Sequence, residues 1–300
     1  MHADQIPERL VELADLAENC RTAFLRNGIA SHWQPTYSSP AAGVQATLEQ
    51  RDRNSFTLVS EVLVTYLEIA AAHLSGMAVL YRSGEAMFPP VPLARSVMEL
   101  SAHAVWVIGS IADTADDILA RAYLEELTSL EAAKFAAGKM HSKESAVHQA
   151  ARQRWSEFRK RVMTVFPETT KADLGASPPA IAGQRLPRPE DCIENLFDRL
   201  RRSAGGTITN EQARGAYSFL CAGTHPSLYH ARQLRVHIKD GHYTRTVLKA
   251  DVASLERLVT MPVIAYYGAL SYMIDFYGLD RAALDELTAR IDEILPTVLR

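Results

Sequence analysis

The chain has 300 residues, of which 47% are hydrophobic and 22% charged, and its formal net charge at pH 7 is −3. This composition is ordinary for a soluble globular protein, and the charge balance argues against a domain whose main role is to coat nucleic acid, although a local basic patch remains compatible with it. The three cysteines, Cys20, Cys192 and Cys221, form no Cys-x-x-Cys pair, so neither a zinc ribbon nor a disulfide framework is indicated. We expect reduced thiols in a cytoplasmic protein.

No segment is typical of membrane insertion. The first twenty residues contain no apolar core of the signal-peptide type. The longest uncharged run, residues 258–274, only reaches the lower limit of a membrane span and contains a proline and three tyrosines. It is therefore predicted as a buried core helix, with no membrane contact.

The first half of the chain shows apolar residues at helical spacing in five segments. These predict helices over residues 6–27, 53–82, 91–109, 113–138 and 143–164. Residues 28–50 contain prolines and little periodicity, and residues 165–188 contain four prolines and two glycines, so both are predicted as loops.

The second half predicts more helices and one β-hairpin. The helices cover residues 189–202, 210–221, 250–277 and 279–297. Between them, Leu234, Val236 and Ile238 alternate with charged residues before an Asp240-Gly241 turn, a pattern that predicts a hairpin over residues 232–247. The fold class is thus an all-α bundle of about eight helices in one domain over residues 1–300, with one small hairpin.

The helix over residues 91–109 raises the main functional question, because it is apolar except for one polar stripe. Arg95, Glu99, His103 and Trp106 share one helix face. Other predicted helices also present polar faces, formed by Glu61, Glu68 and His73, by Arg121 and Glu125, and by Arg214, Tyr217, Ser218 and Cys221. An unpaired charge inside a bundle is strongly disfavoured, so these groups must pair with each other, reach water or meet a ligand.

Two interpretations of the stripe remain open. It is either a buried Arg–Glu network that fixes the helix register, or the wall of a polar pocket between helices. The pocket would be lined by Arg95, Glu99, Arg121, Tyr217, Ser218 and His225. His225 is the strongest single candidate, because it follows a helix in a Gly-Thr-His-Pro turn, where packing rarely needs a histidine.

Several common chemistries lack their motifs in this sequence. There is no pair of Glu-x-x-His motifs for a di-iron site, no His-Glu-x-x-His, no P-loop and no Gly-x-Gly-x-x-Gly, and no Gly-x-Ser-x-Gly elbow. Asp113, Asp116 and Asp117 resemble a magnesium motif of terpene synthases, but they stand at a helix start, where acidic residues are expected anyway. We therefore predict no metal site and no cofactor.

A set of short motifs between residues 90 and 230 is similar to a known family. They are Arg95-Ser96-x-x-Glu99, Trp106, Arg121-Ala122-Tyr123-Leu124-Glu125, Tyr217-Ser218 and His225-Pro226. The chain thereby resembles a domain-of-unknown-function family of bacterial, mainly actinobacterial, helical proteins with an Arg-Ser-x-x-Glu helix and a Ser…His-Pro turn. Some members look distantly like HEPN domains, helical bundles that cut RNA without metal at a dimer interface.

The resemblance implies a role in RNA processing, defence or stress, with Arg95, Glu99, Arg121 and His225 as the polar set. HEPN ribonucleases carry an Arg followed, after four to six residues, by a His. The three such spacings here, Arg26–His32, Arg232–His237 and Arg235–His242, lie outside the polar set and are as frequent as chance predicts. The polar set thus lacks the Arg–His spacing that HEPN ribonucleases carry.

Three functional hypotheses follow. The first is a homodimeric HEPN-like module in which His225 is the general acid or base, since the ordinary pKa of histidine, about 6.5, suits proton transfer. In this hypothesis Arg95 and Arg121 would hold a phosphate or carboxylate. The predicted catalytic residues are His225, Arg95 and Glu99. The predicted substrate-binding residues are Arg121, Glu125, Arg214, Tyr217 and Ser218. The second is a non-catalytic binding or scaffold protein, and the third an enzyme acting on a small molecule in the same pocket.

Overall fold

The fold is all-α, as the sequence predicts. The computed structural model describes residues 5–50, 54–225, 227–249, 251–296 and 298–299. Within these residues it contains twelve helices and two small two-stranded antiparallel sheets. Residues 53, 250 and 297, at the ends of predicted helices, lie outside the described residues.

The elements follow one another along the chain with short connections. The helices are α1 (Gln5–Ser31), α2 (Pro40–Glu49), α3 (Ser55–Arg82), α4 (Pro90–Ile108), α5 (Ala115–Met140), α6 (Ala146–Val165), α7 (Lys171–Gly175), α8 (Pro189–Ala204), α9 (Asn210–Thr224), α10 (Leu228–Gln233), α11 (Val252–Tyr277) and α12 (Ala282–Ile294). The strands are β1 (Ala180–Ile181), β2 (Gln184–Arg185), β3 (Arg235–Asp240) and β4 (Tyr243–Leu248).

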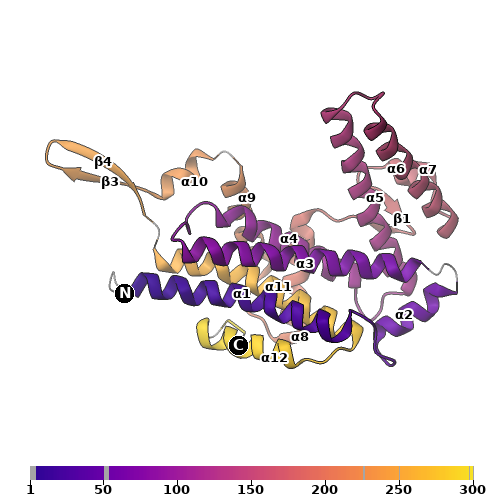
Figure 1. The fold of residues 1–300 in the computed structure, drawn as a ribbon, viewed down its shortest axis with the longest axis horizontal. Helices are drawn as coiled ribbons and strands as arrows, with labels where there is room; N and C mark the ends of the chain where they lie inside the picture. Colours follow the sequence, from indigo (N-terminus) through magenta and orange to yellow (C-terminus); the bar gives the residue numbers. More distant parts are fainter. Residues whose placement is uncertain (1–4, 51–53, 226, 250, 297, 300) are drawn as a thin grey trace.

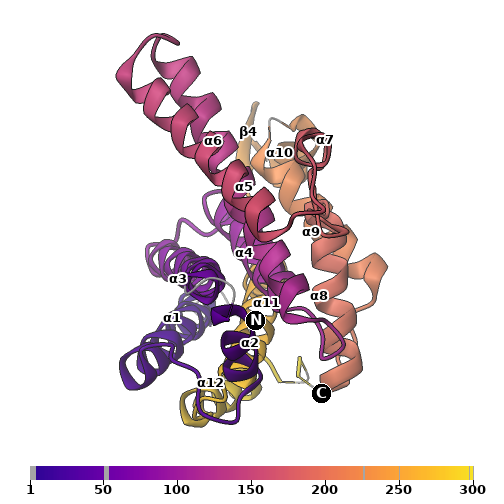
Figure 2. The ribbon, with the colours of Figure 1, turned by 90° about the vertical axis from the view of Figure 1, so that its right-hand side faces the viewer.

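Helix α4 lies at the centre of the bundle. It packs against α3, α11, α8, α9 and α5, so nearly every side of it meets another helix. Figures 1 and 2 show α1, α3, α4 and α11 running alongside one another, with α8 and α9 on the other side of α4. A helix surrounded in this way must be apolar all round, which explains the composition of residues 91–109 and makes its polar stripe exceptional.

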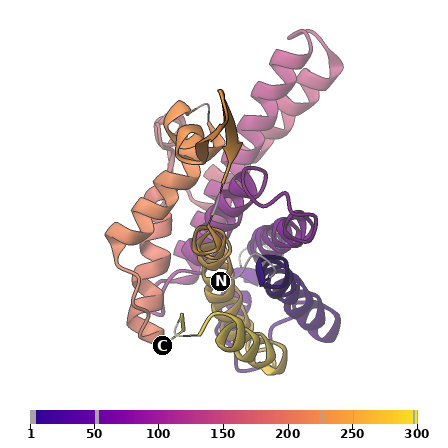
Figure 3. The same cartoon turned by 90° about the vertical axis from the view of Figure 1, so that its left-hand side faces the viewer.

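Two parts of the chain extend away from the bundle. The helical pair α5–α6 continues beyond it at one end (Figures 1 and 3). The hairpin β3–β4 projects at the other end, connected through α10 (Figure 1). Its register pairs Asp240 with Tyr243 across the turn, where Gly241 has a φ of 60°, and this confirms the predicted hairpin.

Three details of the sequence-based prediction are wrong. There are twelve helices in the described residues instead of about eight. The first helix does not end at Asn27 but continues to Ser31, and the side-chain Nδ2 of Asn27, buried within the helix, donates to Ala23 O at 2.9 Å. Residues 28–50 and 165–188 are not loops throughout, since they contain α2 and, in the second segment, α7 and β1–β2.

The structure also identifies which helix has the most membrane-like composition. Among the described residues it is α3, which is long and apolar enough to cross a membrane, but half of its most apolar stretch is buried in the protein. The core helix of a soluble protein has the same properties. The uncharged run 258–274 lies in α11, where Pro262 and most of its neighbours are buried, as predicted for a core helix.

Candidate functional site

Four of the predicted site residues come together between α4 and the end of α9; we call Arg95, Glu99, Tyr217 and His225 the α4–α9 cluster. Arg95 Nε donates to Glu99 Oε1 at 2.8 Å. Arg95 Nη1 lies 3.3 Å from His225 Nε2, and the Tyr217 hydroxyl donates to Glu99 Oε1. The cluster is therefore one connected network in which the arginine joins the carboxylate to the imidazole.

Local structure explains why these residues meet. Arg95 and Glu99 are one turn apart on α4, so they share a face, and α9 packs across that face. His225 is the C-cap residue of α9, in an extended conformation with φ −100° and ψ 158°. This conformation ends the helix and turns the histidine toward Arg95, while Pro226 lies outside the described residues.

The cluster is open to solvent at the histidine and half-buried at the ion pair. The side chains of Arg95 and Glu99 are 23% and 28% exposed, and His225 is exposed. Burial lowers the pKa of Arg95, but its hydrogen bond to Glu99 outweighs this and raises it. Burial and the bond to Glu99 raise the pKa of Tyr217, and the Arg95 guanidinium lies 5.7 Å from the centre of the Tyr217 ring. Arg95 is thus a cation, and Tyr217 a protonated donor, at neutral pH.

The next turn of the polar stripe belongs to a different and more buried network. His103 Nδ1 lies 2.6 Å from Glu125 Oε1 of α5, and the Tyr66 hydroxyl of α3 donates to Glu125 Oε2 at 2.7 Å. Glu125 is only 6% exposed. Burial lowers the pKa of His103, but its contacts with Cys192 and Glu125 dominate and raise it to about 10. This network joins α3, α4 and α5, and no acceptor oxygen of the Glu125 carboxylate is left without a partner.

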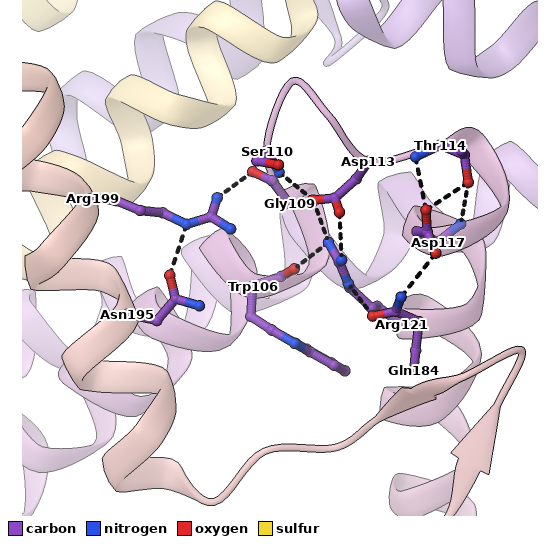
Figure 4. Close-up of polar contacts among 10 residues, drawn as sticks. All are labelled: Trp106, Gly109, Ser110, Asp113, Thr114, Asp117, Arg121, Gln184, Asn195 and Arg199. Carbon is purple, nitrogen blue, oxygen red and sulfur yellow. Dashed lines mark hydrogen bonds and ion pairs between the residues drawn. The ribbon is translucent and has the colours of Figure 1, made fainter.

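A third network surrounds Arg121 at the start of α5 (Figure 4). Its two Nη atoms each lie 3.0 Å from an oxygen of Asp113, and its Nε donates to Gln184 Oε1 at 3.0 Å. Arg121 Nη1 also donates to the Trp106 carbonyl at 3.3 Å. The hydrogen bond from Arg121 lowers the pKa of Asp113 to about 2. Arg121 is almost fully buried, and each of its three guanidinium nitrogens donates to an acceptor within the protein.

The residues that were predicted to line one pocket therefore lie in several separate places. Arg95, Glu99, Tyr217 and His225 meet, whereas Arg121 and Glu125 lie in the two internal networks. Arg214 is exposed and pairs with Glu194 of α8. Ser218 is exposed. The sequence did not predict Tyr66, Asp113, Gln184 and Glu194 as partners. Each comes from another helix or strand or, for Asp113, from the α4–α5 connection, and the sequence does not specify how these segments pack together.

Comparisons with protein-family models, with curated proteins and with solved structures found no match to this chain. The resemblance to the actinobacterial family and to HEPN domains consequently stays a prediction. The candidate site is supported only by the contacts among its residues. Within the described residues no group of three or more His, Cys, Asp or Glu side chains converges to hold a metal ion. The α4–α9 cluster combines a cation, a carboxylate, a phenol and an accessible imidazole, which is a set suited to proton transfer beside a bound anion.

Proposed function

We propose that this protein is a cytoplasmic RNA-processing module of the HEPN-like kind, which cuts RNA at the α4–α9 cluster without a metal ion. The observation that carries the proposal is the 3.3 Å separation of the exposed His225 imidazole from the Arg95 guanidinium. An imidazole can accept or donate a proton near neutral pH, and a guanidinium binds phosphate oxygens. Their contact brings a proton-transfer group beside a phosphate-binding group at the protein surface.

The proposed reaction uses the ribose itself as the nucleophile. The 2′-hydroxyl oxygen forms a bond to the adjacent phosphorus while His225 takes its proton, and the bond from phosphorus to the 5′-oxygen breaks. The 5′-oxygen receives a proton from solvent and His225 returns its proton to solvent, which leaves a 2′,3′-cyclic phosphate and a 5′-hydroxyl. Arg95 stabilises the negative charge that builds on the phosphate oxygens, and Glu99, bonded to Tyr217, holds Arg95 in position.

The charge of the projecting hairpin supports RNA as the partner. Residues 232–249, which we call the basic arm, contain five Arg or Lys residues and one Asp, in a chain whose net charge is −3. The register places Arg235, His237 and Lys239 on one face of the ribbon, with His237 Nδ1 3.0 Å from Thr246 Oγ1 opposite. Such a basic face suits the phosphate backbone, and the arm follows His225 closely in the chain.

The exposed arm also contributes aromatic and apolar surface. Tyr243, next to the turn, is 82% exposed and offers a ring on which a base could stack. A two-stranded hairpin with both faces in water is marginally stable by itself. Binding of a single-stranded RNA segment along the arm would cover the hairpin and direct a phosphate toward Arg95.

A cleavage assay on purified protein tests the catalytic part. We expect total RNA to be cut in the presence of EDTA, with 2′,3′-cyclic phosphate ends, and His225→Ala to lower the rate by about 10²–10⁴-fold. His141→Ala is the matched control, because His141 is also an exposed histidine at the C-cap of a helix, α5, and lies outside the cluster. Intact RNA at every concentration of wild-type protein, or equal cleavage by His225→Ala, would refute the assignment.

Binding measurements separate the arm from the cluster. Replacing Arg235 and Lys239 by Gln should weaken RNA binding and lower its dependence on salt concentration, since each lost phosphate contact reduces the slope. His225→Ala should bind RNA as the wild type does. The homodimer that the HEPN resemblance implies is part of this proposal, and sedimentation of the free protein and of its RNA complex tests it.

A second candidate is a non-catalytic binding protein, favoured by apolar side chains exposed on α10. Leu228 and Tyr229 are 70% and 72% exposed, whereas no large apolar residue of α11 or α12 is exposed among the described residues. A partner or a second copy would then bind at α10. Leu228→Ser with Tyr229→Ser would then abolish binding of the partner or self-association, and the wild-type protein would leave RNA intact, which distinguishes this candidate from the first.

A further inference from the structure

A pocket with a volume of about 810 Å³ opens between α2, the α4–α5 connection, α8 and α11. None of the α4–α9 cluster residues lines it, so an inference about it is independent of the proposed RNA processing. The volume falls in the range of about 300–1,000 Å³ that is typical of sites for small organic ligands.

Most of the pocket wall is apolar and comes from separate elements. The apolar lining is formed by Pro40, Val44, Ile108, Ile111, Ile118 and Phe276. Ile111 belongs to the α4–α5 connection and is fully exposed at the pocket rim. Removing an apolar side chain from water is favourable, so contact between Ile111 and the apolar body of a ligand would stabilise the complex.

One cation on this wall lacks a carboxylate partner. Arg199 of α8 donates from Nη1 to the Gly109 carbonyl and from Nε to Asn195 Oδ1 at 2.8 Å, and both acceptors are neutral (Figure 4). Burial lowers the pKa of Arg199 and the neighbouring Arg121 adds to this, whereas Tyr272 and Asp113 act in the opposite direction. Its Nη2 has no hydrogen-bond acceptor among the described residues.

The other charged residues of the pocket are each paired. Asp113 holds Arg121, Asp275 pairs with Arg281, and Arg202 pairs with Asp198. Two hydroxyl groups also line the pocket, Ser203 Oγ and Tyr272 OH, which lie 3.0 Å apart. The pocket thus offers one guanidinium whose hydrogen-bond acceptors are both neutral, and the hydroxyl of Tyr272, at the edge of an apolar wall.

We propose that this pocket binds a small organic oxyanion, with its carboxylate or phosphate group at Arg199 and its apolar body against Val44, Ile118 and Phe276. A ligand oxygen would take the free Nη2 donor, and a guanidinium is suited to carboxylates and phosphates alike. The Ser203 hydroxyl already donates to the Arg199 carbonyl at 2.9 Å, so the further donor would be the Tyr272 hydroxyl, turning from Ser203 to the ligand. If Arg199 served only to hold the Gly109 carbonyl at the end of α4, the pocket would not prefer anions.

Calorimetric titration with three eight-carbon probes tests the preference: octanoate, octyl phosphate and octanol. We expect at least one of the anions to bind ten-fold or more tightly than octanol, and comparison of the two anions identifies the head group. Arg199→Gln should remove that preference, whereas Arg201→Gln should retain it, because Arg201 is an arginine of the same helix that pairs with Asp198 and does not line the pocket. Equal binding of octanol and both anions, or an unchanged preference in Arg199→Gln, would overturn the proposal.

A second variant fills the pocket without touching Arg199. Gly43 of α2 lines the pocket, and a Cβ atom there would meet nothing within 4 Å, so Gly43→Leu should fold normally. It should weaken anion binding at least ten-fold. Gly215→Leu is the control, because Gly215 is also helical with open surroundings but does not line this pocket. Unchanged binding in Gly43→Leu, or no binding of either anion to the wild type at millimolar concentration, would contradict the proposal whatever the result of the RNA assay.

Discussion

His103 and Glu125 form a close pair inside the bundle, with Nδ1 2.6 Å from Oε1 and both side chains largely withdrawn from water. Buried charges are stable only when they are paired and hydrogen-bonded, and Tyr66 supplies the second hydrogen bond to the carboxylate. The pair links α4 to α5, and through Tyr66 to α3. The middle of the polar stripe is therefore a structural ion pair that fixes the register of three helices.

The pair predicts a loss of stability in alkaline solution. The pKa of His103 is raised to about 10 in the folded protein, against an ordinary value near 6.5. A raised folded-state pKa contributes stability that is fully present below about pH 6.5 and is lost as the pH rises toward 10, at up to about 1.4 kcal/mol per pH unit. Urea unfolding between pH 6 and pH 10 measures this slope.

Two variants show whether the slope belongs to His103. His103→Gln should remove most of it. His73→Gln should leave it in place, because burial lowers the pKa of His73 and so confines the linkage of that residue to acid pH. A wild-type free energy of unfolding that is constant from pH 6 to pH 10 would show that His103 is neutral in the folded protein.

The sequence predicted the elements whose signals are local and repeated. The helical period identified α4, and the Asp240-Gly241 turn between alternating residues identified β3–β4. Helices α2 and α7 were missed because they are short, although both carry local start signals. Ser39 accepts a hydrogen bond from Ala42 N at the start of α2, and Thr170 forms a capping box with Asp173 at the start of α7.

The candidate site was predictable only in part for a related reason. The Arg95–Glu99 pair follows from a spacing of four residues on one helix. The partners of Arg121 come instead from the α4–α5 connection and from β2, through Asp113 and Gln184. Which helix meets which at a given turn depends on packing over the whole bundle, so the sequence could suggest one pocket where the structure has three networks.

Gly109 is predicted to be the least replaceable glycine of the chain segment around Arg121. Its φ is 74°, and a Cβ atom there would overlap both Arg121 and Asp113. Gly84 has a similar φ of 82° but open surroundings. We expect Gly84→Ala to cost about 1–2 kcal/mol from the backbone alone, and Gly109→Ala about 3–5 kcal/mol, because it also breaks a buried ion pair.

Chemical denaturation of the two glycine variants measures this difference. Equal losses would mean that Arg121 and Asp113 move aside without cost. In that case the Arg121 network would not be rigid, and the pKa of Asp113, lowered to about 2 mainly by Arg121, would return toward its ordinary value in Gly109→Ala. An NMR titration of the Asp113 carboxyl group provides the second measurement.

The three thiols should differ sharply in reactivity in the native protein. Cys20 and Cys192 are at most 1% exposed, whereas Cys221 is only half-buried. Burial raises the pKa of Cys20, and only a thiolate reacts quickly with a disulfide reagent. We expect Ellman's reagent to modify one thiol per chain rapidly, and Cys221→Ala to remove that phase. All three thiols should react after denaturation, and fast native labelling of Cys192 would contradict the packing of α8.

The exposed end of the polar stripe leads to a different expectation from its buried middle. Glu99 pairs with Arg95, but the two side chains are 28% and 23% exposed. Water screens such a pair, so Glu99→Gln should cost about 1 kcal/mol, well below the 3–5 kcal/mol expected for breaking a fully buried pair. The variant keeps the shape of the side chain and can still accept the hydrogen bond from Tyr217.

Thermal unfolding and RNA cleavage should therefore respond differently to Glu99→Gln. Stability should fall slightly, while cleavage should fall further, because Arg95 loses the charge that positions it beside His225. Glu68→Gln, at an exposed glutamate of α3, is the control and should change neither. A loss of 3–5 kcal/mol in Glu99→Gln would extend the structural role of His103 and Glu125 along the whole stripe. In that case, cleavage by Glu99→Gln and by the wild type would have to be compared under conditions in which both are equally stable, before a loss of cleavage could be assigned to the α4–α9 cluster.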